Sequence, residues 1–342
     1  MGDKLVTLCG LFFGMTIIAY CIIVLKQYTY LQPATYRLAV LSSRTALVLP
    51  LCTFLMFIAL VAPSSYVMMM FFITLIEGYS LYAFLALITT NLGGPQATVE
   101  LMEKAQRPML CSVCLPKEPV RFFRMTVWVL FHVLAMRSIC SLISAICFYS
   151  GTQSGKSAYA FFNVLSALVL VCGFVCLINL YENVYEYLIN LFGVLKLALL
   201  KVSIGAIVIQ GLIENILYST GSLSYDDDDA HSAQEKSMRV YCGLVMVELA
   251  LLSLLYYYAF GDHKITPSSA PAAVRAFLHD QRSPNKVSTS GVRAVETLVY
   301  SLRSFLADIV AIQDVLEVGF FHVDGALDEP LTSRVAGWDA PS

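Results

Sequence analysis

The amino-acid sequence predicts an all-α polytopic membrane protein, a seven-transmembrane-helix bundle followed by a cytoplasmic amphipathic tail helix. The composition is the first observation: 58% of the 342 residues are hydrophobic and only 13% are charged, a balance that soluble domains do not show. The second is that the apolar residues form runs long enough to cross a bilayer as helices, which close their backbone hydrogen bonds within each span. Within a transmembrane domain at 1–262, seven such runs occupy residues 5–25, 45–63, 66–92, 125–149, 158–181, 197–219 and 240–260.

Lysine and arginine are distributed unequally over the connections between these runs. Twelve lie in the first, third and fifth connections and the adjoining tail, against four on the other side. Because cytoplasmic loops are enriched in basic residues, we expect an extracellular N-terminus and a cytoplasmic C-terminus. The expected location is the plasma membrane. The acidic run 226–229 would then be extracellular, and it lacks the spacing of a calcium loop. The net charge of -2 gives no general attraction to nucleic acid, so no nucleic-acid partner is expected.

The third connection carries a C-x-x-C pair, Cys111 and Cys114, after a predicted short surface helix at 96–107. Zinc binding would need a second pair or suitably spaced histidines, which the sequence lacks. Apolar and basic neighbours at a membrane surface favour S-palmitoylation of both cysteines, and two unmodified thiols are the alternative. The remaining cysteines fall mostly inside apolar runs, where cysteine behaves as a small hydrophobe, so we expect no structural disulfide.

The tail divides into three parts. Residues 263–291 are rich in Ser, Pro and Ala and are expected to form a flexible linker. Residues 292–318 place apolar side chains at three- and four-residue spacing, which predicts an amphipathic helix. That helix could lie on the inner leaflet, pack on a partner, or pack against the cytoplasmic face of the same chain. Residues 319–342 are expected to be disordered.

Charged side chains within the spans are few, and each is costly in a bilayer. Glu77 is the single charge in the third run, and Arg137 lies at the midpoint of the fourth. We predict that these two side chains lie at similar depth on neighbouring helices and interact directly or through water. Glu77 could serve a function or act only as helix glue. Lys201, about one turn inside the cytoplasmic end of the sixth run, is either a group that meets an anion or an anchor that snorkels to the interface.

Known catalytic motifs are absent from the sequence. There is no G-x-S-x-G, no H-E-x-x-H and no Walker-type loop, and the five histidines are scattered. We therefore expect no enzyme, no cofactor and no metal site. Few charges and many aromatic residues suit an amphipathic organic ligand better than a small ion.

Two stretches resemble the organic solute transporter alpha-subunit family. Residues 77–87, EGYSLYAFLAL, lead into Asn91-Leu92-Gly93-Gly94 and are similar to the family's E-x-Y-x-x-Y-x-F-L stretch before a Gly-Gly turn. Residues 195–211 are similar to its K-F-x-x-x-K … Q-G sixth helix, and Asn163 with Ser166 fits the N-x-x-S of its fifth. The chain departs from the family in its thinner cysteine cluster and in Ser138, where a proline often follows the basic residue of helix four.

The resemblance covers roughly residues 1–262 and implies seven spans with an extracellular N-terminus. It also implies facilitative, bidirectional movement of sterols, bile-acid-like conjugates and other amphipathic anions, with a small single-span beta subunit as partner. Membrane lipids and further copies of the chain are the other expected partners.

We therefore expect a facilitative carrier of amphipathic organic anions such as steroid conjugates or bile-acid-like solutes. No nucleotide motif or sodium-site pattern is present, so transport would run downhill. The site would open sideways to the inner leaflet between the third, fifth and sixth spans. Its expected residues supply positive potential, apolar walls and orienting amides; they are Glu77, Tyr79, Tyr82, Phe84, His132, Arg137, Asn163, Lys201 and Gln210.

Two alternatives come from other classes of protein. A seven-helix receptor has the same number of spans, but the third span lacks a D-R-Y-like end and the seventh lacks N-P-x-x-Y. A membrane-trafficking or membrane-organising protein without a transported substrate is favoured only by the amphipathic tail.

Overall fold

The structure, a computed structural model, describes residues 2–29, 36–105, 118–149, 153–188, 193–219, 230–261, 302–304 and 306–310. Seven helices or helix pairs in this part of the chain are long and apolar enough to span a membrane, as the sequence predicts. The elements are α1 (Gly2–Thr29), α2 (Tyr36–Ala46), α3 (Val48–Val61), η2 (Pro63–Ser65), α4 (Tyr66–Asn91), α5 (Pro95–Ala105), α6 (Pro119–Tyr149), α7 (Gln153–Leu188), α8 (Gly193–Ser219) and α9 (Ala230–Gly261).

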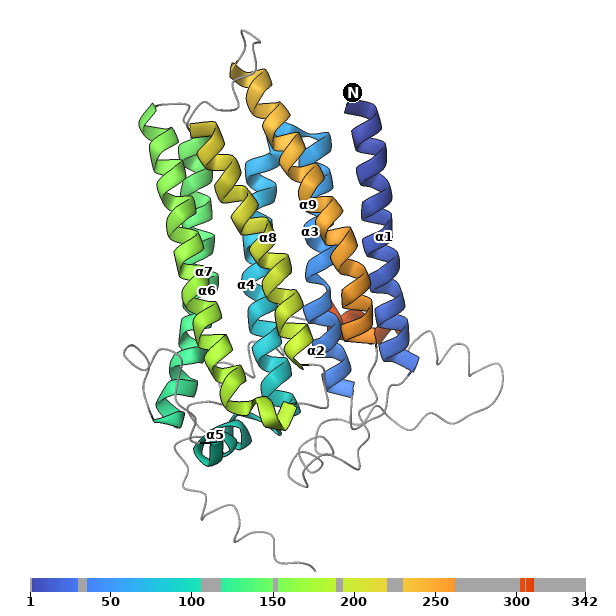
Figure 1. Cartoon of the computed structure of the whole chain (residues 1–342), viewed down its shortest axis with the longest axis vertical. Coiled ribbons are helices and arrows are strands. Elements are labelled where there is room, and N and C mark those ends of the chain that lie inside the picture. The colour runs from blue at the N-terminus through green and yellow to red at the C-terminus, as the bar shows by residue number, and fades with distance from the viewer. Residues whose placement is uncertain are drawn as a thin grey trace, which may run out of the picture.

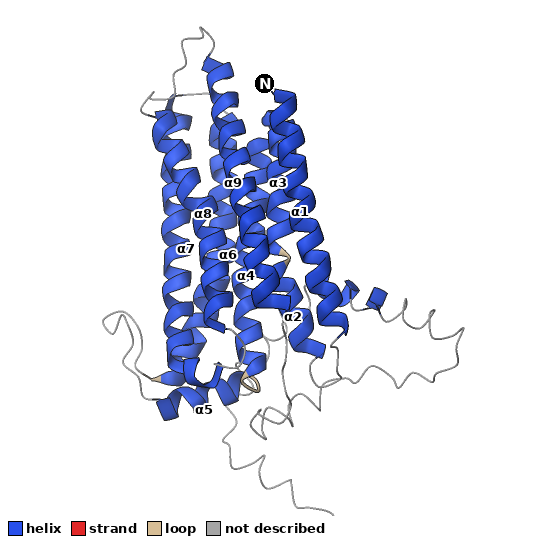
Figure 2. Ribbon diagram, turned by 45° about the vertical axis from the view of Figure 1, so that its right-hand side comes forward, coloured by secondary structure: helices blue, strands red, loops and turns tan. Residues whose placement is uncertain are grey.

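The long helices run side by side along the longest axis of the molecule (Figure 1). The start of α1 and the turn at η2 lie at one end of the bundle, which we name the N-terminal end. The short helix α5 lies beyond the spans at the opposite end, the α5 end, in both views (Figures 1 and 2). Large apolar side chains such as Leu11, Ile146 and Leu251 are exposed around the outside, as a bundle surrounded by lipid requires.

The second span differs from its predicted limits of 45–63. It begins at Arg37 and is made of α2 and α3, which meet at a break where the Leu47 N–H bonds to both Ser43 O (3.0 Å) and Arg44 O (3.2 Å). The polar residues of α2 lower the local hydropathy, so the beginning of the span is not recognised in the sequence. In the structure these residues are buried in the bundle. Arg44, which the charge count places in a loop, is only 1% exposed.

Two tight connections agree with the sequence. Pro63–Ser65 forms a single 3₁₀ turn between α3 and α4, where the sequence leaves only two residues between the second and third runs. Gly93 and Gly94 adopt φ values of 97° and 105°, in the left-handed region that glycine tolerates. The Gly94 N–H bonds to Thr89 O at 2.8 Å and closes α4, and Pro95 then begins the predicted short helix, α5.

The predicted tail helix at 292–318 is described only at 302–304 and 306–310, and both pieces are helical. Ile309 is 2% exposed and packs against Val24 of α1 and Ala39 and Val40 of α2. The described part of the tail therefore packs against the bundle of the same chain, which is one of the three predicted arrangements. Cys111, Cys114, the acidic run 226–229, the linker 263–291 and the end 319–342 lie outside the described residues.

Candidate substrate site

Three helices approach one another closely near the middle of the bundle because glycines line the crossing points. A Cβ atom added to Gly78 of α4 would lie 2.7 Å from Leu134 Cδ1 and 3.2 Å from Leu134 Cα on α6. One added to Gly173 of α7 would lie 2.8 Å from Val133 Cγ2, on α6 as well. Small residues thus let α6 settle between α4 and α7, as in other membrane helix pairs.

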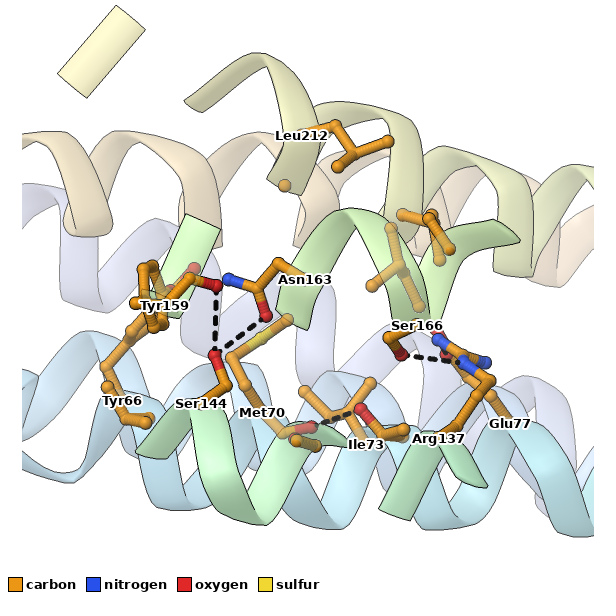
Figure 3. Close-up of a pocket in the computed structure, with 17 residues that line it drawn as sticks. Tyr66, Met70, Ile73, Glu77, Arg137, Ser144, Tyr159, Asn163, Ser166 and Leu212 are labelled. Atoms are coloured by element: carbon orange, nitrogen blue, oxygen red, sulfur yellow. Dashed lines mark hydrogen bonds and ion pairs between the residues drawn. The ribbon is translucent and has the colours of Figure 1, made fainter. Parts of the chain in front are cut away.

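This close packing brings Glu77 and Arg137 together. Arg137 Nη2 lies 2.6 Å from Glu77 Oε2, and the two side chains are 4% and 1% exposed. The prediction of a direct interaction between these residues at similar depth is confirmed. Arg137 Nε also donates to Ser166 Oγ of α7 at 3.3 Å, so the guanidinium links three helices (Figure 3).

One donor and one acceptor of the pair remain without hydrogen-bond partners among the described residues. They are Arg137 Nη1 and Glu77 Oε1, both buried. A guanidinium offers five N–H donors in a planar fork, and here only part of that capacity is used. The unused donor and acceptor are what a ligand at this position could engage.

A polar stripe continues from the ion pair toward the N-terminal end of the bundle. On α6, Ser141 and Ser144 follow Arg137 at i+4 and i+7, which places them on one face of the helix. On α7, the antiparallel neighbour, Asn163 lies opposite Ser144. The Ser144 hydroxyl is 3.1 Å from Asn163 Oδ1 and 3.4 Å from the carbonyl oxygen of Tyr159 (Figure 3).

A cavity follows this stripe between α4, α6, α7 and α8. Its walls include Tyr66 and Ile73 of α4, the polar residues of α6 and α7, and apolar side chains of α8 such as Ile207. Its volume is about 70 Å³. At roughly 10–15 Å³ for each water molecule, that is room for a few waters, whereas pockets for drug-sized ligands measure roughly 300–1,000 Å³. The cavity is too small for an organic anion in this structure.

Of the residues that the sequence predicts for the site, Glu77, Arg137 and Asn163 line this cavity and the others do not. His132 is exposed on the outer face of α6, with Nδ1 2.8 Å from Trp128 O. Lys201 is exposed on α8, nearer the α5 end, and Gln210 is half-buried outside the cavity. Tyr79 packs against the core, where Phe84 is 1% exposed.

Tyr82 belongs to a second, smaller cavity of about 10 Å³, which also contacts Pro95 and Phe123. The expected site near Lys201 and the inner leaflet therefore does not coincide with this cavity and stays a prediction. The polar cavity occupies the other half of the bundle, and α6 is one of its walls.

Sequence reasoning missed Tyr66, Ser141, Ser144 and Tyr159 as members of the site. A signal for them exists in the spacing: polar residues at 137, 141 and 144 on one span face polar residues at 159, 163 and 166 on the next. Two such stripes at i, i+4 and i+7 on consecutive apolar spans predict a shared polar interior. In the described residues, no group of three or more His, Cys, Asp or Glu side chains is placed to hold a metal ion.

The fold and the site define a multi-pass helical membrane protein whose bundle encloses a charged polar cavity. A model of the organic solute transporter Ostalpha family matches residues 5–265, and the chain belongs to this family. The family resemblance seen in the sequence is confirmed, and membership indicates organic solute transport. No curated protein and no solved structure gives a significant match to the chain.

Proposed function

We propose that the protein is a facilitative transporter of amphipathic organic anions, such as steroid conjugates or bile-acid-like solutes. The observation that carries this proposal is the Arg137–Glu77 pair on the wall of an intramembrane cavity, with one donor of Arg137 still unused. An arginine within a bilayer requires an anion or water, and it binds carboxylate or sulfate oxygens in its planar fork.

The geometry allows the site to be stable both empty and loaded. Without substrate, Glu77 balances the charge of Arg137, so no lone buried cation has to be desolvated. With substrate, Nη2 keeps Glu77, Nε keeps Ser166, and Nη1 donates to the anionic end of the ligand. A site whose ion pair persists through both states binds the anion weakly enough to release it, which downhill exchange requires.

Helix α8 is the wall that we propose to move. It packs mainly on α9 and has few contacts with α7 and α4, whereas α6 and α7 pack along much of their length. Displacing α8 from α7 would enlarge the cavity where apolar side chains such as Ile207, Val208 and Leu212 could cover a steroid body. The anionic end would stay at Arg137, and the apolar end would face α8.

We further propose a plasma-membrane location with the N-terminus extracellular and the α5 end cytoplasmic. This orientation rests on the excess of lysine and arginine at the α5 end. A single-span beta subunit is the proposed partner, together with the membrane lipids around the apolar exterior. Labelling of an N-terminal epitope in intact, unpermeabilised cells would support the orientation, and labelling only after permeabilisation would refute it.

Uptake of a labelled steroid sulfate into proteoliposomes tests the function. Liposomes holding the chain alone, and the chain with a single-span beta subunit, should take up the substrate without ATP or a sodium gradient. Preloading with unlabelled substrate should accelerate uptake, because a facilitative carrier exchanges in both directions. Arg137→Gln should lose uptake while Ser138→Ala, a neighbour whose hydroxyl donates to Leu134 O within α6, should keep it. Equal uptake by empty liposomes and by both preparations would refute transport of this substrate class.

We also propose that Cys111 and Cys114 are palmitoylated, because their loop is cytoplasmic in this orientation and two lipid signals anchor far better than one. Hydroxylamine-sensitive labelling should be present in the natural chain and absent from a Cys111→Ser/Cys114→Ser variant. Labelling that persists unchanged in the double variant would place the acyl groups on other cysteines.

A further inference from the structure

A segment of the tail is docked on the bundle far from the cavity. The tail segment, residues 302–304 and 306–310, lies beside the ends of α1 and α9 at the α5 end (Figure 1). Ile309 is buried in a small apolar cluster with Val24, Ala39 and Val40, next to Tyr20 and Leu47. Its neighbours Leu306 and Val310 are 43% and 69% exposed, so Ile309 is the apolar side chain by which the described tail residues dock.

A buried arginine holds the same segment through its backbone. Arg44 Nε lies 2.9 Å from Asp308 O and 3.1 Å from Ile309 O, and Arg44 Nη2 also donates to Asp308 O. Backbone carbonyl oxygens that accept from a guanidinium form charge-assisted hydrogen bonds, which are stronger than neutral ones. Arg44 is itself 1% exposed, so the tail segment is part of what surrounds this side chain.

Further contacts tie α1, α2 and α9 together beside the tail segment. Gln27 Nε2 of α1 donates to Phe260 O of α9 and lies 3.3 Å from Ser42 Oγ of α2. Lys26 lies over the ring of Tyr257, 4.2 Å from its centroid. Of these helices, α2 packs against α4 and α9 packs against α8, and both α4 and α8 line the cavity.

We propose that the tail segment is an autoinhibitory strap. Docked, it adds Ile309 and two backbone carbonyls to the α1–α2 surface and restrains the helices that support the cavity walls. Undocked, it leaves α2 and α9 free to follow α4 and α8 during transport. The strap lies outside residues 5–265, the part of the chain that matches the family. This inference rests on the proposed transport function.

The first test compares two adjacent substitutions in the full chain. Ile309→Asp places a charge in the apolar cluster and should release the strap, whereas Val310→Asp adds the same charge at an exposed position. In the proteoliposome assay with the labelled steroid sulfate, Ile309→Asp should raise the initial rate roughly 3- to 10-fold, the gain available when the active state is a minor population. Val310→Asp should match the natural chain.

The second test locks the strap instead of releasing it. A Val40→Cys/Ile309→Cys variant should form a disulfide on oxidation, lose transport, and regain it on reduction. A Val40→Cys/Val310→Cys variant is the control for oxidation of the other thiols. If Ile309→Asp, or the oxidised Val40→Cys/Ile309→Cys chain, transported at the same rate as the natural chain, the strap proposal would be wrong. Transport itself would still be established. A lower rate in Ile309→Asp at an equal amount of folded protein would also overturn it, because the segment would then support transport. An inactive natural chain would instead refute the proposed function.

Discussion

Arg137 of α6 and Glu77 of α4 form a buried ion pair, with Nη2 and Oε2 2.6 Å apart, inside a helical bundle whose outer surface is apolar. Either charge alone would cost several kcal/mol within a membrane, so each accounts for the presence of the other. The pair is also set among serines on two helices and borders a cavity. A pair that served only to join helices would not need an adjoining polar cavity.

Removing one partner of the pair should therefore harm folding more than removing both. Arg137→Gln or Glu77→Gln leaves a lone buried charge, and we expect each to lower stability by about 3–5 kcal/mol. The double variant Glu77→Gln/Arg137→Gln should recover most of that loss but still fail to transport a steroid sulfate. Thermal unfolding in detergent, together with uptake, measures both effects. A double variant as unstable as either single variant would show that the pair does not behave as a unit.

Gly78 fixes how closely α4 and α6 approach, and it predicts a steric effect. A Cβ at this position would lie 2.7 Å from Leu134 Cδ1 and 3.2 Å from the Leu134 backbone, so Gly78→Ala should cost about 1–3 kcal/mol. Gly205 of α8 is the matched control, because no atom of the described residues lies within 4 Å of a Cβ there. Gly205→Ala should be neutral or stabilise by about 0.5–1 kcal/mol, as alanine does within a helix. A similar melting temperature for the two variants would contradict the close crossing.

The spans and the ion pair could be predicted because both depend on the free energy of transferring side chains into the bilayer. A hydropathy profile of the sequence reports that free energy directly. A charge in an apolar run is so costly that two of them at similar depth imply each other. Hydropathy does not show toward which side of its helix a side chain points. His132 and Arg137 are five residues apart on one span, yet one is exposed and the other is buried. The depth of a side chain in the membrane follows from its position in the apolar run. Whether the side chain faces the bundle or the lipid depends on which helices pack against its own.

Arg44 shows a second limit of sequence reasoning. The polar residues around it lower the local hydropathy, so the span is predicted to begin after it. The structure buries this arginine beneath a segment more than 250 residues further along the chain. Such a partner is not visible in any local window of the sequence.

Asn163 should contribute to substrate affinity more than to folding. It lines the cavity and is only half-buried, so its amide can donate to a bound substrate, a hydrogen bond of about 1 kcal/mol. Asn163→Ala should therefore raise the apparent KM for a steroid sulfate by roughly fivefold with little change in melting temperature. Ser203→Ala, whose hydroxyl meets Tyr256 away from the cavity, is the control. An unchanged KM in Asn163→Ala would remove this residue from the site.

Lys201 and Arg137 are the two cations that could meet an anionic substrate, and they lie in different parts of the bundle. Lys201 is exposed on α8 outside the polar cavity, in a position from which a long side chain reaches the membrane surface. Arg137 is buried beside the cavity with one donor unused. Lys201→Gln should therefore transport anionic and neutral sterols in the same ratio as the natural chain. Arg137→Lys keeps the charge but loses the planar fork, and it should lower that ratio for the anion. Parallel uptake of a steroid sulfate and its unconjugated sterol measures both ratios. A lowered ratio in Lys201→Gln, with an unchanged one in Arg137→Lys, would move the anion site to the α5 end and to the lipid-facing side of α8.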